Sequence, residues 1–271
     1  MFKGGKVRIF TNLKSRVIRV LTIFSLLTLT IVVQQASPSS ASNLYYSGIG
    51  YDTSYPQGTA TSTPPGFAII GLGHGRPFTA NTYASSEVQL AINAGASTSF
   101  YFNTGYALAY AKSDYADCTK QSSYEYPLFS GHLQSQMQAA WAIGCSESEY
   151  ATLVAPAGDS PVAWWADIET GNSWSKNTVL NQATVDGIIY ELHAKSSVPV
   201  GVYSTPSMWQ QITGTSYVNS GIDADWQTGV TTCPSAGFTL TGSPTTLAPT
   251  WIIQNGTTSV GGDNFDLDTA C

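Results

Sequence analysis

Charged side chains are scarce in this chain of 271 residues, and basic ones are concentrated at its start. Only 10% of residues are charged, and six of the 11 Lys and Arg residues fall within the first 19 positions. All 17 acidic residues lie beyond residue 42, where only five basic residues remain, so this part carries a net charge of −12. Nucleic-acid binding needs clustered Lys and Arg, and anionic lipid attracts polybasic segments. The acidic body therefore argues against both kinds of partner.

Motifs of several enzyme classes are also missing. The chain has no GxSxG nucleophile motif, no glycine-rich phosphate loop and no HExxH metal motif. No two of its four cysteines have CxxC spacing, and the three histidines, His74, His132 and His193, are scattered. We therefore predict no metal site.

Only one long uncharged apolar run occurs, over residues 20–33. It follows a basic segment and precedes a stretch of small residues, which is the pattern of a secretory signal peptide. We predict a signal peptide over residues 1–41, cleaved after Ala41, and a secreted or cell-surface protein. The alternative is an uncleaved membrane anchor, although a span needs about 20 residues. After cleavage we expect a monomer without stable membrane association.

The cysteines fit an exported protein. An even number in such a chain predicts two disulfides, for which three connectivities exist. Proximity in sequence favours Cys118–Cys145 and Cys233–Cys271.

Short runs rich in β-branched and aromatic residues predict about eight strands. Helical periodicity is clear over residues 177–196 and weaker over 84–94, 132–143 and 206–212. Strands and helices alternate up to residue 213, which predicts βα units around a parallel sheet. We therefore expect one α/β domain over residues 42–271, a TIM-like barrel that is helix-poor in its C-terminal third. The predicted strands are 45–52, 67–73, 98–103, 162–169, 200–204, 222–227, 250–254 and 264–268.

Acidic residues recur where these strands are predicted to end, which is the functional end of such a barrel. They are Asp52, Asp167, Glu169, Asp225 and Asp266. Asp167 and Glu169 are two positions apart, so both face the same side of a strand. Two close carboxylates resist ionising together, and we expect this to raise the pKa of Glu169 most. One acid and one anion suit glycosidic cleavage, whereas the simpler interpretation is a polar strand end.

Aromatic residues accompany the acidic ones. Tyr101, Trp165, Tyr203, Trp226 and Trp251 lie in or beside the predicted strand ends. Flat aromatic faces suit sugar rings, although any one of these residues could instead fill the core.

These motifs together resemble glycoside hydrolase family 25, the lysozymes (muramidases) that cleave bacterial peptidoglycan. The resemblance covers nearly all of residues 48–268, in order. Its elements are DTSYPQG at 52–58, FAII at 67–70, AINAG at 91–95, Tyr101, the D-x-E at 167–169, Tyr203-Ser204, the W-x-x-Q at 251–254 and the D-x-D at 266–268.

The resemblance implies an enzyme that hydrolyses β-1,4 bonds of peptidoglycan without a cofactor. Glu169 would be the general acid/base, and Asp167 would orient the substrate's N-acetyl group for neighbouring-group attack. Asp52 and Asp266 would shape the charge of the site, and Tyr203 would bond to the sugar. The implied substrate-binding set is Asp52, Asp266, Tyr203, Tyr101, Trp251 and Gln254.

The chain also departs from the family pattern. Gly71 and His74 replace a usual Lys and Glu, and Tyr101-Phe102-Asn103 replaces Tyr-His-Phe. The disulfides and residues 104–160 are not typical either. Two alternatives stay open: a catalytically silent barrel that binds glycan or cell wall, and a hydrolase of another polysaccharide.

Overall fold

The structure is a computed structural model that describes residues 44–125, 132–234 and 248–271. The predicted signal peptide lies outside these ranges.

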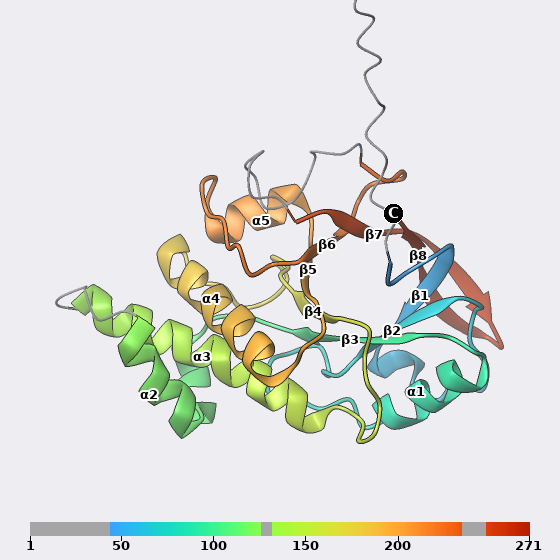
Figure 1. Ribbon diagram of the computed structural model, residues 1–271, viewed down its shortest axis with the longest axis horizontal. Coiled ribbons are helices and arrows are strands. Elements are labelled where there is room, and N and C mark those ends of the chain that lie inside the picture. The colour runs from blue at the N-terminus through green and yellow to red at the C-terminus, as the bar shows by residue number, and fades with distance from the viewer. Residues whose placement is uncertain (1–43, 126–131, 235–247) are drawn as a thin grey trace, which may run out of the picture. The chain divides into compact units, whose positions relative to one another are not determined.

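Eight strands form a closed barrel in which each strand pairs with its neighbour in sequence and β8 closes on β1 (Figure 1). This confirms the predicted TIM-like barrel and all eight predicted strands. The strands are β1 (Ile49–Thr53), β2 (Phe67–Gly71), β3 (Thr98–Asn103), β4 (Trp164–Asp167), β5 (Val200–Ser204), β6 (Ala224–Thr228), β7 (Thr250–Val260) and β8 (Asp263–Ala270).

The last strand runs in the opposite direction to the other seven. Strands β1 to β7 run parallel, but β8 runs antiparallel to both β7 and β1. Gly261 and Gly262, both with positive φ, make the turn of the β7–β8 hairpin. As a result the N-terminal half of β8, rather than its C-terminal end, lies at the rim formed by the carboxyl ends of the other strands.

The helices lie mostly between the first six strands, as predicted. Helix α3 is longer than expected, and α2 and the two 3₁₀ helices were not predicted. In the described part of the chain, no residue after Thr213 is helical, in agreement with the helix-poor C-terminal third. The helices are η1 (Tyr55–Gln57), α1 (Ala84–Asn93), η2 (Leu108–Ser113), α2 (Ala116–Glu125), α3 (His132–Val154), α4 (Thr178–Lys195) and α5 (Pro206–Thr213).

Helices α3 and α4 pack side by side at very short range (Figure 1). A Cβ atom on Gly144 would lie 1.9 Å from the carbonyl oxygen of Thr184, and one on Gly187 would lie 2.1 Å from that of Trp141. Only glycine permits this approach at the two positions. The Cys118–Cys145 disulfide ties α2 to α3, and Cys233–Cys271 holds the last residue, so both predicted pairings are confirmed.

Side chains alternate between the inside of the barrel and the layer beneath the helices. Phe67, Ile69, Trp165 and Trp226 fill the inside. A second cluster, which includes Ile188, packs between the strands and the helices. Among the described helices, none has the length and apolar character of a membrane span.

Candidate active site

A cavity of about 200 Å³ opens at the carboxyl ends of the parallel strands, where such barrels carry their functional residues. Every strand except β2 contributes to its wall, directly or through the residues that follow it. The lining residues are Asp52, Ser54, Tyr101, Asn103, Asp167, Glu169, Tyr203, Trp226, Gln254 and Asp266.

The structure brings together every predicted catalytic and substrate-binding residue except Trp251. Trp251 is the second residue of β7, so it lies at the opposite end of the barrel. There its ring stacks on Tyr45, with centroids 4.8 Å apart, beside His193 and Asp223. The prediction that Trp251 lines the cleft is therefore wrong, because the strand begins only one residue earlier.

Two acidic residues also need correction. Asp225 is buried near the start of β6, does not line the cavity, and is not at a strand end. Asp266 reaches the cavity, but from the middle of the antiparallel β8, where it pairs with Asp52 of β1. It therefore reaches the mouth because the strand direction is reversed.

The cavity contains two polar residues that the sequence analysis did not assign to the site, Ser54 and Asn103. Asn103 Nδ2 donates a hydrogen bond of 2.6 Å to Asp167 Oδ2, because the two residues pair in register on β3 and β4. Asp167 Oδ1 is buried without a hydrogen-bond partner in the described structure. Asn103 thus holds one carboxylate oxygen of Asp167 in place, and the residue forms part of the cavity wall.

A hydrogen-bonded chain holds the opposite wall. Gln254 Nε2 donates to Asp52 Oδ2 at 2.8 Å, while Gln254 Oε1 accepts bonds from Tyr203 Oη at 2.8 Å and Thr228 Oγ1 at 3.0 Å. The glutamine of the W-x-x-Q motif therefore connects β5, β6, β7 and β1 across the mouth.

The DTSYPQG segment at residues 52–58 links the end of β1 to the start of β8. The backbone N–H and the hydroxyl of Ser54 both donate to Gln57 Oε1 at 3.0 Å, and Gln57 Nε2 donates to the carbonyl of Asn264 at 2.9 Å. Gln57 consequently fixes the start of β8, two residues before Asp266.

Burial raises the pKa values of the carboxyl groups around the cavity. The pKa of Asp167 is raised to about 8 by burial and by the nearby charge of Glu169, although the Asn103 bond acts in the opposite direction. Burial is also the main cause that raises the pKa of Asp52 to about 7. Burial also raises the pKa of Glu169 and that of Asp266. The expectation that the pKa of Glu169 is raised most is wrong, because Asp167 is more deeply buried and its pKa is raised further.

A further carboxyl group lies on the inner face of β8. Asp268 is fully buried, accepts a 2.8 Å bond from Trp226 Nε1, and its pKa is raised well above the usual value by burial and by Asp52. Burial therefore favours the neutral form of this carboxyl group, which extends the acidic cluster inward.

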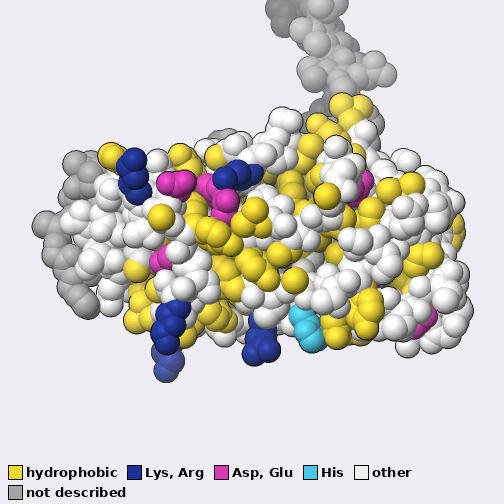
Figure 2. Space-filling view, turned by 90° about the horizontal axis from the view of Figure 1, so that it is seen from below, with side chains coloured by type: hydrophobic (Ala, Val, Ile, Leu, Met, Phe, Trp, Pro, Cys, Tyr) yellow, Lys and Arg dark blue, Asp and Glu magenta, His cyan; other side chains and the backbone are white. Residues whose placement is uncertain are grey.

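Within the described ranges, one group of residues brings metal-ligating atoms close together: Cys118, Cys145 and Glu191. The two cysteines form a disulfide, so they offer no thiolate and the group does not fit a metal ion. The basic side chains visible on the face drawn in Figure 2 stand apart from one another.

The fold is that of a TIM-like barrel, and solved lysozymes and muramidases share this fold. The bacterial lysozyme from Streptomyces coelicolor is 18% identical over 83% of this chain and 92% of its own, with a TM-score of 0.51. Muramidases from Trichobolus zukalii and Acremonium alcalophilum are each 16% identical, with TM-scores of 0.52 and 0.51. They cover 83% and 82% of this chain and 94% and 93% of their own.

No family model and no curated protein sequence matches the chain. The structural likeness confirms that the fold resembles that of lysozymes and muramidases, which the distributed sequence motifs predicted.

Proposed function

We propose that this protein is an exported glycoside hydrolase that cleaves β-1,4 bonds of peptidoglycan, with Glu169 as general acid/base and Asp167 as the residue that orients the substrate. The observation that carries this proposal is the pair of carboxyl groups at the end of β4. Glu169 is half-buried at the mouth, and the buried Asp167, whose carboxyl group Asn103 holds, lines the same cavity. Export is supported by the two disulfides, which persist in oxidising compartments.

The carboxyl group of Asp167, which lines the cavity, suits the N–H of an N-acetyl group. In the free protein the pKa of Asp167 is raised to about 8, so its carboxyl group retains a proton below that pH. A substrate amide that donates to this carboxyl group stabilises its charged form and lowers this pKa, as hydrogen bonds to an ionised group do. The proton shared by the two neighbouring carboxyl groups then resides on Glu169, where the reaction needs it.

The chemical step follows from this arrangement. Glu169 gives its proton to the glycosidic oxygen as the bond from that oxygen to the anomeric carbon breaks. The carbonyl oxygen of the N-acetyl group attacks the anomeric carbon, and the Asp167 carboxylate stabilises the positive charge that develops on the cyclic intermediate. Water then opens this ring and gives a proton to Glu169, which restores the acid.

Substitution of Glu169 tests the assignment. Glu169→Gln keeps the shape but removes the transferable proton, so turnover on cell-wall glycan should fall about 10²- to 10⁴-fold. Binding of glycan fragments should survive, because the walls of the cavity are unchanged. Fragment binding by a wild-type protein that shows no turnover would instead identify a silent glycan-binding barrel.

A further inference from the structure

An aromatic platform lies at the rim immediately beside the cavity. Tyr55 follows Ser54, a cavity residue at the end of β1, and His74 follows the end of the adjacent β2. The two rings stack with centroids 3.6 Å apart and planes 28° apart, and Tyr83 packs against Tyr55 at 5.3 Å. His74 is exposed, so the stack is accessible to a ligand.

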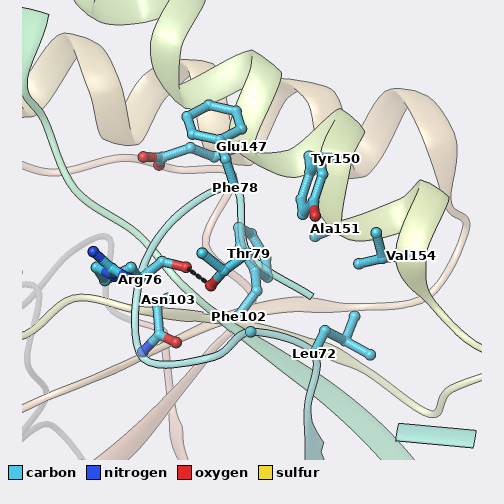
Figure 3. Close-up of a pocket in the computed structure, with 11 residues that line it drawn as sticks. Leu72, Arg76, Phe78, Thr79, Phe102, Asn103, Glu147, Tyr150, Ala151 and Val154 are labelled. Atoms are coloured by element: carbon cyan, nitrogen blue, oxygen red, sulfur yellow. Dashed lines mark hydrogen bonds between the residues drawn. The ribbon is translucent and has the colours of Figure 1, made fainter. Parts of the chain in front are cut away.

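The loop that carries His74, residues 73–79, is held in a defined shape. The His74 N–H donates to Thr79 Oγ1 at 2.9 Å, and Thr79 Oγ1 donates to the carbonyl of Arg76 at 2.6 Å (Figure 3). Phe78 has a φ of 56°, and its ring packs edge-on against Tyr110 and Tyr150, each at 5.9 Å. A bulky residue stays in the left-handed region only where its surroundings enforce it, and such residues cluster at ligand sites.

Arg76 is the cation that this loop presents. Its guanidinium has no carboxylate partner within ion-pair distance among the described residues, whose ion pairs involve only His193 and Lys195. Arg76 and Asn103 line one narrow cavity and lie on the same side of it, opposite Ala151 and Val154 (Figure 3). Asn103 also lines the catalytic cavity, so Arg76 lies one side chain away from it.

An unpaired arginine at this place has a specific consequence. The catalytic cavity is lined by four carboxyl groups and no basic residue among those described, so an anionic ligand is repelled where the groups are ionised. Arg76 offers a planar donor that matches a carboxylate, next to an aromatic surface that matches a sugar ring.

We propose that Tyr55, His74 and Arg76 form a subsite beside the catalytic cavity for a pyranose ring that bears a carboxylate-containing substituent. The His74–Tyr55 stack contacts the apolar face of the ring, and Arg76 binds the carboxylate. This inference rests on the proposed function and deepens it, since the glycan of peptidoglycan carries such substituents on alternate sugars.

Charge-matched ligands test the role of Arg76. Affinity is measured in the Glu169→Gln background for peptidoglycan fragments with free carboxylates and for the same fragments after their carboxylates are coupled to methylamine. The free form should bind more tightly than the neutral form, and Arg76→Ala should reduce that ratio about fivefold, as for a solvent-screened ion pair. Arg76→Lys should retain part of the preference, because it keeps the charge but not the planar donor.

Lys112→Ala, which removes an exposed cation on η2, is the matched control and should leave the ratio unchanged. An unchanged ratio in Arg76→Ala, or an equal loss in Lys112→Ala, would overturn the assignment of Arg76.

Ring-conserving variants test the platform. His74→Ala should weaken both fragment forms severalfold, and His74→Phe should restore binding because it replaces one flat ring by another. Equal weakening by both variants would contradict a stacking role.

The subsite and the proposed function can fail separately. If the wild-type protein hydrolyses no glycan while the carboxylate preference depends on Arg76, the proposed function fails and the subsite stands. If the wild-type protein hydrolyses glycan but shows no carboxylate preference, the subsite fails and the proposed function stands.

Discussion

The hydrogen bond from Asn103 to Asp167 gives a quantitative prediction. Asn103→Ala removes a 2.6 Å donor to a buried carboxyl group, and this donor favours the ionised form. A hydrogen bond to a charged group contributes about 1.5–3 kcal/mol, and about 1.4 kcal/mol corresponds to one pKa unit. The pKa of Asp167 should therefore rise by about one to two units, and kcat should fall about 10- to 100-fold.

The pH–rate profile on soluble glycan fragments reports this change. In the proposed mechanism Asp167 acts as an anion, so its titration sets the acid limb of the profile and that of Glu169 sets the alkaline limb. Removing the donor should move the acid limb to higher pH by about one to two units, with little change in KM. Asn103→Asp, which has the same shape but replaces the donor by a second acid, should move the limb further.

Thermal unfolding of both variants at pH 5 serves as the folding control. A profile that falls uniformly at every pH, with its acid limb in place, would refute the positioning role of Asn103.

Three further predictions concern stability and the corrected residues. Asp52 and Asp167 have pKa values raised by burial to about 7 and 8 from 3.8, so the stability that their neutral forms contribute is fully present below about pH 4. This stability is lost as the pH rises through 7 and 8, so the thermal midpoint should be lower at pH 8.5 than at pH 5. Asp167→Asn should reduce the difference between the two midpoints. An equal difference in the variant would contradict the explanation. Quantitative thiol labelling of the denatured, unreduced protein should find no free cysteine, and two labelled thiols would rule out the pairing. Double substitution of Cys118 and Cys145 to serine should lower the free energy of unfolding by about 3–4 kcal/mol. Trp251→Ala should lower the thermal midpoint through lost packing without changing KM. A raised KM would indicate that Trp251 binds substrate after all.

The barrel could be predicted from the sequence because its strands are marked locally. Runs of β-branched and aromatic residues identified all eight strands, and the spacing of Asp167 and Glu169 placed both in one mouth. The direction of β8 was not predicted, although the Gly261-Gly262 pair between two strand patterns is a hairpin signal that could have revealed it. Helix α2 has little hydrophobic periodicity of its own and is held against α3 by the Cys118–Cys145 bridge.

The residues that the sequence analysis missed depend on register and loop shape. Asn103 reaches Asp167 because β3 and β4 pair at these two positions, and no local pattern encodes that pairing. Trp251 was misplaced for a related reason, because it precedes the cavity end of β7 by three residues and its motif partner Gln254 alone reaches the mouth. Arg76 approaches the cavity through a loop whose shape depends on Phe78 and Thr79.

Product analysis on intact cell walls tests the central claim most directly. Purified sacculi are incubated with the mature protein, and the released fragments are identified by mass spectrometry after reduction. The proposed function predicts new reducing ends at muramic acid with the wild-type protein and almost none with Glu169→Gln. Sacculi that yield no new reducing ends, or that yield them equally with Glu169→Gln, would contradict it.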